Sequence, residues 1–117
     1  MSAPNPPISP LAVAFPKMPA IAGAELASGS AGLYKHVRDD VLVMRLSPGT
    51  TCAGVFTRHR VGSAPVDWCQ QTLAASGGAD LRGLVVNAGC ANSFTGKPGA
   101  AAAARVAAAA AKRLGMS

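Results

Sequence analysis

The side chains best suited to chemistry in this sequence are gathered between residues 87 and 97. This stretch, NAGCANSFTGK, contains amides, a thiol, hydroxyls, glycines and one lysine. It follows the apolar run at residues 84–86, which predicts a strand buried on both faces. Loops at the carboxyl ends of strands often carry the sites of α/β proteins. The same residue types also form ordinary turns, and a strand–turn–helix connector without a site is the commoner case.

Phosphate binding is the first chemistry to test, because Gly89, Gly96 and Lys97 resemble parts of a nucleotide-binding loop. Such a loop has four residues between its first glycine and its Gly-Lys pair, followed by Ser or Thr. Here six residues separate Gly89 from Gly96, and Pro98 follows Lys97. The dinucleotide pattern GxGxxG is also missing from the stretch. The spacing therefore argues against a nucleotide site.

Cysteine and histidine suggest no metal chemistry. The three cysteines, Cys52, Cys69 and Cys90, and the two histidines show no CxxC or HxxxH spacing, so no metal site and no cofactor are predicted. An odd number of cysteines without a secretory signal fits reduced, mostly buried thiols in a cytoplasmic chain. Because Cys90 lies in the polar loop, a cysteine-dependent enzyme is one alternative, although nothing in the sequence identifies its base.

Motifs along nearly the whole chain resemble the amino-terminal part of the ornithine acetyltransferase family. The two longest are AGVFTRHRVGSAPVDWC at residues 53–69 and VVNAGCANSFTGKPG at residues 85–99. Residues 15–16 with 21–23, and residues 38–40 followed by VLVM, resemble earlier parts of the family in the same order. Cys90 departs from the family pattern, which commonly has asparagine there. The loop residues that match it are Asn87, Gly89, Asn92, Thr95 and Gly96.

The resemblance implies an acyltransferase of arginine biosynthesis that moves an acetyl group from N-acetylornithine to glutamate. Some family members also use acetyl-CoA as the donor. The implied fold resembles that of amino-terminal nucleophile hydrolases, in which the precursor cuts itself before a threonine that then acts as nucleophile. In the family, a Thr-Gly pair stabilises the oxyanion. Both features are expected beyond Ser117, so no catalytic residue is predicted in this chain, and the loop motif is assigned a structural role.

Length and charge favour the same interpretation. Family members have several hundred residues in two chain types that form a heterotetramer, whereas this chain has 117 residues. We therefore expect an inactive portion whose main partner is the remaining part of the same enzyme. The net charge is +6, but the basic residues are scattered without interleaved aromatics, which argues against nucleic acid binding. The competing class is a small non-catalytic binding or interaction module.

The sequence predicts neither a signal peptide nor a membrane span. Prolines interrupt the apolar part of the first 20 residues, and Arg105 interrupts the apolar tract at residues 100–111. A cytoplasmic protein is expected. We predict an extended proline-rich tail over residues 1–20 and a partial domain over residues 21–117. Because alanine supplies much of the apolar fraction, little apolar area is available for a core.

The elements that must position the loop form an α/β (α+β) unit, with helices on a layered mixed sheet. Strands are predicted at residues 21–27, 33–36, 41–46, 51–57 and 84–86. The dipeptide Pro48-Gly49 predicts a turn that joins the third and fourth strands into a hairpin.

Two helices complete the predicted unit. The first begins after Ser63 as a candidate cap, has Pro65 in its first turn, and ends at Gly77. The second is the alanine-rich segment at residues 98–114. Gly96 must turn the chain from the loop into this helix within one or two residues. We therefore predict a positive φ or a close backbone contact at Gly96.

Overall fold

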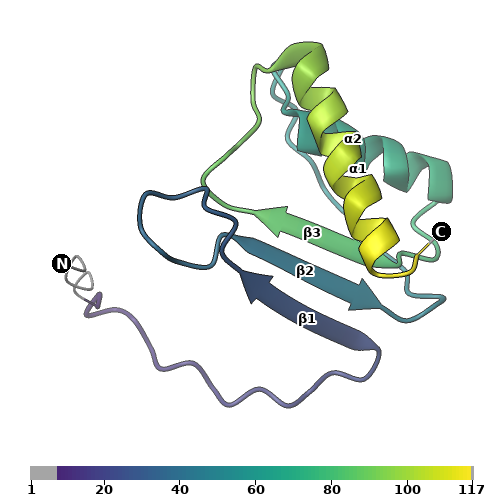
Figure 1. The fold of residues 1–117 in the computed structure, drawn as a ribbon. Coiled ribbons are helices and arrows are strands. Elements are labelled where there is room, and N and C mark those ends of the chain that lie inside the picture. Colours follow the sequence, from purple (N-terminus) through teal and green to yellow (C-terminus); the bar gives the residue numbers. More distant parts are fainter. Residues whose placement is uncertain (1–7, 117) are drawn as a thin grey trace.

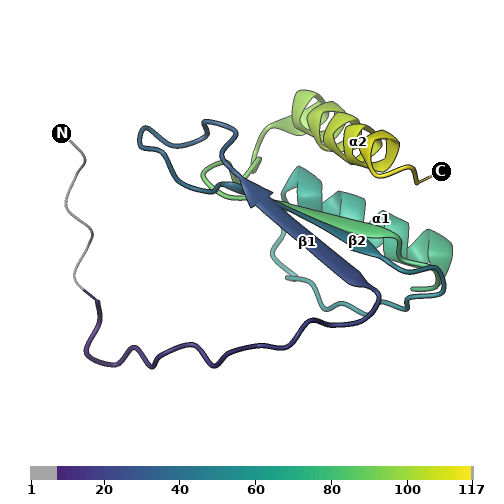
Figure 2. The same cartoon turned by 60° about the horizontal axis from the view of Figure 1, so that its bottom comes forward.

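A computed structural model describes residues 8–116 of the chain. Its elements are β1 (Ala24–Gly29), β2 (Val41–Leu46), α1 (Ala64–Ser76), β3 (Gly83–Asn87) and α2 (Gly96–Arg113). The strands form one antiparallel sheet in the order β1-β2-β3 (Figure 1). Both helices lie next to β3, whereas β1 forms the far edge of the sheet (Figures 1 and 2). The predicted α/β class is confirmed by its match to solved structures described below.

The two faces of the sheet differ in how they are covered. On one face Val43 lies between Ala27 and Val85 in the pairing register, and α2 passes over this face. The other face carries Leu26, Leu84 and Val86, whose side chains are 58%, 41% and 45% exposed. The prediction that the strand at residues 84–86 is buried on both faces is therefore wrong for this chain. One face packs toward α2, and the apolar side chains of the other face are only partly covered.

The packed interior is small. Among residues 8–116 no hydrophobic residue is buried, and the one buried charged residue is Asp40, which is 3% exposed. The helix that covers the sheet, α2, consists mainly of alanine, so it contributes little apolar area at the contact. The small apolar core expected from the composition is confirmed. Polar contacts fix much of the loop structure.

Two predicted strands are wrong: residues 33–36 and 51–57 form no strand. The turn after β2 is present, with Gly49 at a φ of 79° and a hydrogen bond from the Thr50 N–H to the Ser47 carbonyl. It leads the chain out of the sheet, however, where the Cys52 N–H donates to the Gly78 carbonyl. Both neighbours of β2 therefore come from elsewhere, and the described sheet is antiparallel rather than mixed.

The helix boundaries agree well with the sequence. Ser63 is the residue before α1, although its side chain makes no capping hydrogen bond, and Gly77 ends the helix at a φ of 61°. The second helix begins at Gly96, two residues before the predicted start. Gly96 has a φ of 55°, which confirms the predicted positive value. A Cβ at this position would meet nothing within 4 Å, so the glycine is required by backbone conformation alone.

The segment before β1 lies apart from the sheet. Residues 8–20 contain no helix or strand and are exposed along their whole length. In Figure 1 this segment, drawn in purple, runs below the sheet and turns up only to enter β1. The first seven residues of the predicted tail lie outside the described residues, and the division into a tail and a domain stays a prediction. No helix within residues 8–116 has both the length and the apolar character needed to cross a bilayer.

Candidate functional site

Side-chain amides brace the loop between β3 and α2. Asn87 Nδ2 donates to the Cys90 carbonyl at 2.9 Å, which closes the first half of the loop. Asn92 Nδ2 donates to the Gly99 carbonyl at 3.0 Å, and Thr95 Oγ1 donates to Asn92 Oδ1 at 2.6 Å. The second half of the loop is thereby tied to the first turn of α2. These hydrogen bonds give a structural reason for an asparagine or threonine at each position.

The loop backbone is held in conformations that most residues avoid. The φ angle is 87° at Gly89, 48° at Asn92 and 58° at Phe94. Glycine adopts such angles freely and asparagine tolerates them, whereas a large aromatic residue does so only under constraint. The Phe94 side chain is 81% exposed, so packing of that ring does not supply the constraint. The hydrogen bonds of the flanking residues supply it.

The loop also lies directly on α2 and contacts the start of α1. Gly99 is buried in the first turn of α2, and a Cβ there would be 2.6 Å from both Asn92 Oδ1 and Thr95 Cβ. The Asn92 carbonyl accepts the Ala64 N–H at 3.2 Å, and Ser63 forms a bridge to Ser93. The loop is therefore fixed by β3, by α2 and by the amino-terminal end of α1.

A second loop, between β1 and β2, covers Gly89. A Cβ at Gly89 would be 2.9 Å from Cε2 of Tyr34, so the ring lies against the bare backbone. The guanidinium of Arg38 is stacked over the Tyr34 ring, with its Cζ 4.4 Å from the ring centroid. The centroids of the Tyr34 and His36 rings are 5.7 Å apart. Sequence reasoning assigned no role to Tyr34. A glycine in the loop motif was the available signal for a close neighbour, but it does not identify that neighbour.

Asp40 anchors the loop that carries Tyr34. Its Oδ1 accepts the Ala31 N–H at 2.6 Å, and its Oδ2 accepts the Leu33 N–H at 2.7 Å. These backbone hydrogen bonds, that from Ala31 above all, hold the pKa of the Asp40 carboxyl below its usual value, although burial opposes the shift. The backbone of Asp40 connects β1 to the motif, because its N–H donates to the Gly29 carbonyl and its carbonyl accepts the Ala88 N–H.

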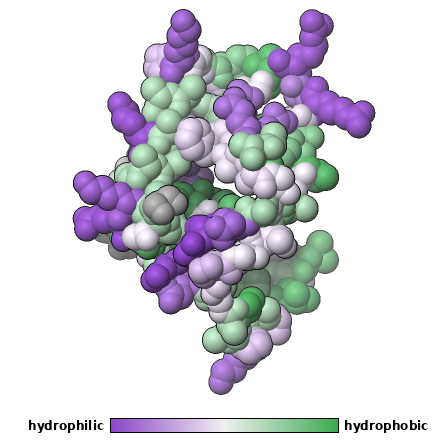
Figure 3. Space-filling model, turned by 90° about the vertical axis from the view of Figure 1, so that its right-hand side faces the viewer, coloured by the Kyte–Doolittle hydropathy of each residue, from purple (hydrophilic) through white to green (hydrophobic). Residues whose placement is uncertain are grey.

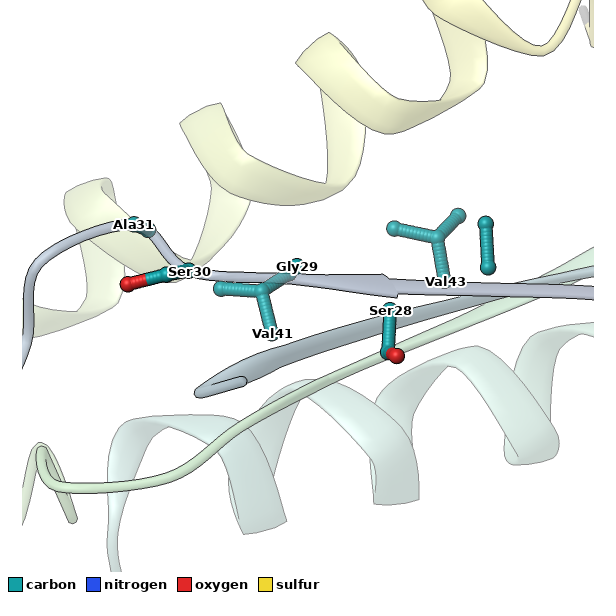
Figure 4. Close-up of a pocket in the computed structure, with 7 residues that line it drawn as sticks. Ser28, Gly29, Ser30, Ala31, Val41 and Val43 are labelled. Atoms are coloured by element: carbon teal, nitrogen blue, oxygen red, sulfur yellow. The ribbon is translucent and has the colours of Figure 1, made fainter. Parts of the chain in front are cut away.

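Two shallow pockets lie elsewhere. One, of about 300 Å³, surrounds the end of β1, and Figure 4 shows Val43 and Ser28 on opposite sides of the strands there. It is lined by Ala27, Ser28, Gly29, Ser30, Ala31, Val41 and Val43, none of which can act as an acid or base near neutral pH. The other, of about 590 Å³, lies between β1 and the end of α2. Neither pocket is lined by a residue of the loop motif.

The three cysteines are free thiols. Cys52 and Cys69 are half-buried and Cys90 is exposed, so the prediction of mostly buried thiols is wrong. The cause is the thin covering of the sheet, which leaves even apolar side chains accessible. Within residues 8–116, no group of three or more His, Cys, Asp or Glu residues is placed to hold a metal ion.

The exposed Cys90 should react as an ordinary thiol. Among residues 8–116 no hydrogen bond reaches its sulfur, and the contact that holds it is through its carbonyl, from Asn87. A thiol without a charged activator has no reason to react faster than a model thiol. Alkylation with iodoacetamide, read by mass spectrometry, should be no faster at Cys90 in the folded chain than in the denatured chain. Cys52 and Cys69 serve as internal controls, and rapid, acid-shifted labelling of Cys90 alone would favour a cysteine enzyme.

The arrangement of sheet, helices and braced loop matches enzymes of solved structure. The ornithine acetyltransferase of Mycobacterium tuberculosis, solved with ornithine, superposes with a TM-score of 0.68 at 38% identity over 74% of this chain and 44% of that chain. The arginine biosynthesis bifunctional protein ArgJ of Bacillus halodurans gives a TM-score of 0.75 at 27% identity over 82% of this chain and 49% of that chain. The fold is thus that of the acetyltransferase class.

The chain belongs to the ArgJ family, whose model matches residues 25–117. The arginine biosynthesis bifunctional protein ArgJ of Caulobacter vibrioides is 70% identical over 99 residues, which are 85% of this chain and 25% of the relative. That of Mesorhizobium japonicum is 50% identical over 109 residues, 92% of this chain and 26% of the relative. The chain spans about a quarter of the length of these relatives. The resemblance found in the sequence motifs is confirmed.

Proposed function

We propose that this chain is the amino-terminal portion of an ornithine acetyltransferase of arginine biosynthesis, acting in the cytoplasm. The complete enzyme would transfer acetyl from N-acetylornithine to glutamate. The observation that carries the proposal is the 70% identity to a protein named for bifunctional arginine biosynthesis. Because that name includes a second function, transfer from acetyl-CoA to glutamate is part of the proposal. An ornithine-bound enzyme among the structural relatives supports the substrate class.

The chemistry proposed for the complete enzyme is a double displacement. A threonine hydroxyl attacks the acetyl carbonyl, the amide bond breaks, and ornithine leaves with the proton returned to its amine. The glutamate amine then attacks the resulting ester, which releases the threonine and gives N-acetylglutamate. By resemblance, the threonine and the oxyanion-stabilising pair belong to the remaining part of the enzyme. The residues of this chain supply a rigid support, in which Asn87, Asn92 and Thr95 fix the loop between β3 and α2.

The surface of the chain fits a role within a larger assembly. β2 is the central strand, so no strand within residues 8–116 pairs with the outer edge of β1 or β3, and another strand can complete either edge. The apolar face with Leu26, Leu84 and Val86 is open to a covering layer. In Figure 3, hydrophilic side chains project in several groups from a surface that is otherwise largely pale or green. These features support the remaining part of the same enzyme as the partner. By resemblance to the family, the proposed assembly is a heterotetramer of two chain types.

Complementation tests this proposal. The 117-residue chain is produced together with the remaining part of the Caulobacter relative, and transfer from N-acetylornithine to glutamate is measured. We expect turnover from the mixture and none from the remaining part alone. The intact relative is the positive control. A stable complex that shows no transfer, under conditions in which the intact relative is active, would contradict the proposal.

A further inference from the structure

We propose that Asp40 is a positioning residue for the loop at residues 87–96. Its carboxylate holds residues 31–34 so that Tyr34 covers Gly89 and fixes the first half of that loop. The importance of this loop rests on the proposed function, but the inference concerns what sets its geometry. The test below reads that geometry directly, so its failure is distinct from a failure of acetyl transfer.

The Asp40 carboxylate accepts hydrogen bonds from the backbone of its own loop. Residues 30–39 form no strand, so their N–H groups lack ladder partners. The carboxylate takes two of them, from Ala31 and Leu33, at 2.6 Å and 2.7 Å. Hydrogen bonds to an ionised acceptor are short and roughly twice as strong as neutral ones. A carboxylate that is 3% exposed and bound in this way defines the conformation of the loop.

The loop between β1 and β2 contacts the loop between β3 and α2 through Tyr34 and Gly89. Tyr34 follows directly after the anchored Leu33, and its ring meets the backbone at Gly89. Arg38, stacked at 4.4 Å on the ring, restricts the ring to this place. Gly89 lies between the two residues joined by the hydrogen bond from Asn87 to the Cys90 carbonyl. A ring that presses on Gly89 therefore acts on the segment that this hydrogen bond closes.

The backbone of Asp40 makes two further hydrogen bonds, one to β1 and one to the loop after β3. The Asp40 N–H donates to the Gly29 carbonyl at 3.0 Å, and the Asp40 carbonyl accepts the Ala88 N–H at 2.8 Å. Both loops thus meet at one residue. The backbone contacts survive any change of side chain, whereas the hold on residues 31–34 depends on the carboxylate. Replacing the carboxylate separates the positioning effect from the strand pairing.

The charge state of the Asp40 carboxyl sets the pH range over which it holds the loop at residues 31–34. On the segments whose backbone contacts Asp40, residues 29–39 and 83–89, the ionisable side chains are those of Tyr34, Lys35, His36, Arg38 and Asp39. Because the folded-state pKa of Asp40 is lowered, its contribution is fully present above the unfolded-state pKa. It is lost as the pH falls through the lowered folded-state value. The contact of Tyr34 with Gly89 should therefore persist at neutral pH and disappear in acid.

Nuclear magnetic resonance on the isotope-labelled chain tests the inference. The Hα protons of Gly89 should be shifted upfield by the Tyr34 ring in the unmodified protein. In Asp40→Asn they should move toward the values of an unstructured glycine, while cross-strand contacts between Val43 and Val85 remain. The matched control is Asp39→Asn, which removes a neighbouring carboxylate that accepts from Ser28 Oγ, its one hydrogen-bond partner within residues 8–116, and should leave the Gly89 shift unchanged.

Acid titration of the unmodified protein provides a second measurement that does not depend on the folding of a variant. The Gly89 Hα shift should follow the titration of the Asp40 carboxyl carbon, and His36→Gln should leave this transition in place. An unchanged Gly89 shift in Asp40→Asn with an intact sheet would overturn the proposal. If Asp40→Asn does not fold, the titration decides. A Gly89 Hα shift that stays constant while the Asp40 carboxyl titrates would overturn the proposal.

Discussion

The 117-residue chain assayed by itself should transfer no acetyl group from N-acetylornithine to glutamate. Covalent acyl transfer needs a nucleophile with a base within hydrogen-bonding reach. We propose, from the resemblance to the family, that the self-cleavage threonine belongs to the remaining part of the enzyme. The loss expected is complete rather than partial, because binding and positioning alone cannot form an acyl-enzyme. A chromatographic assay for N-acetylglutamate, with the complemented mixture as positive control, measures it.

We expect that the hydroxyls of the chain itself do not replace that threonine. The Thr95 hydroxyl is committed to Asn92, through both its side-chain and main-chain oxygens. Ser28 Oγ donates to Asp39, but this pair is exposed and lies beside a pocket without a charged group to stabilise an oxyanion. If the isolated chain did show turnover, Ser28→Ala, Thr95→Ala and Cys90→Ser would identify the nucleophile. If one of these substitutions abolished that turnover, the proposal that the nucleophile belongs to the remaining part of the enzyme would be refuted.

Replacing Gly99 with alanine should destabilise the protein, although alanine is the better helix former. The gain in helix propensity is about 1 kcal/mol. Against it, the new Cβ would be 2.6 Å from Asn92 Oδ1 and from Thr95 Cβ, and rotating the Thr95 side chain does not move its Cβ. The loop must shift, which strains it and loosens the hydrogen bonds of Asn92. We expect a net loss of about 1–3 kcal/mol in the free energy of unfolding.

Urea unfolding followed by the fluorescence of Trp68, the one tryptophan of the sequence, measures this loss. Gly29→Ala is the matched control, because a Cβ at Gly29 would meet nothing within 4 Å and its φ is not positive. Its unfolding midpoint should equal or slightly exceed that of the unmodified protein. Equal midpoints for Gly99→Ala and the unmodified protein would show that the loop yields freely, contrary to the packing described here.

The helices and their ends could be predicted from the sequence because local rules decide them. Gly77 and Gly96 have the positive φ that a helix end or an abrupt change of direction requires, and Pro65 is tolerated in a first turn. β2 and β3 could also be predicted, because a short apolar run within each segment indicates a strand. For these elements, the information lies within a few residues of the feature itself.

The partners of these elements could not be predicted locally. The Pro48-Gly49 turn is real, yet the chain after it pairs with the segment after α1, at Gly78, instead of with β2. Residues 33–36 have strand-like composition, but a side chain from Asp40 takes their hydrogen bond at Leu33. Strand propensity is a preference for a partly buried pleated surface, and only the folded chain decides where that surface exists.

The sequence motif located the candidate loop, whereas its supports came from the structure. The asparagines and glycines of the motif proved to be the residues that brace and bend the loop. Asp40 lies within the motif at residues 38–40, but nothing in the sequence predicted that its carboxylate is buried or what it binds. Its burial follows from the meeting of two loops that are distant in sequence.

The strand order has a consequence for the growing polypeptide. β1 and β2 are joined by the loop at residues 30–40, whereas the longer connection at residues 47–82, which includes α1, separates β2 from β3. Closing a long loop costs conformational entropy before any contact repays it, so the first hairpin forms early and the third strand docks late. During synthesis, β2 therefore presents an open edge to neighbouring chains until residue 87 has left the ribosome.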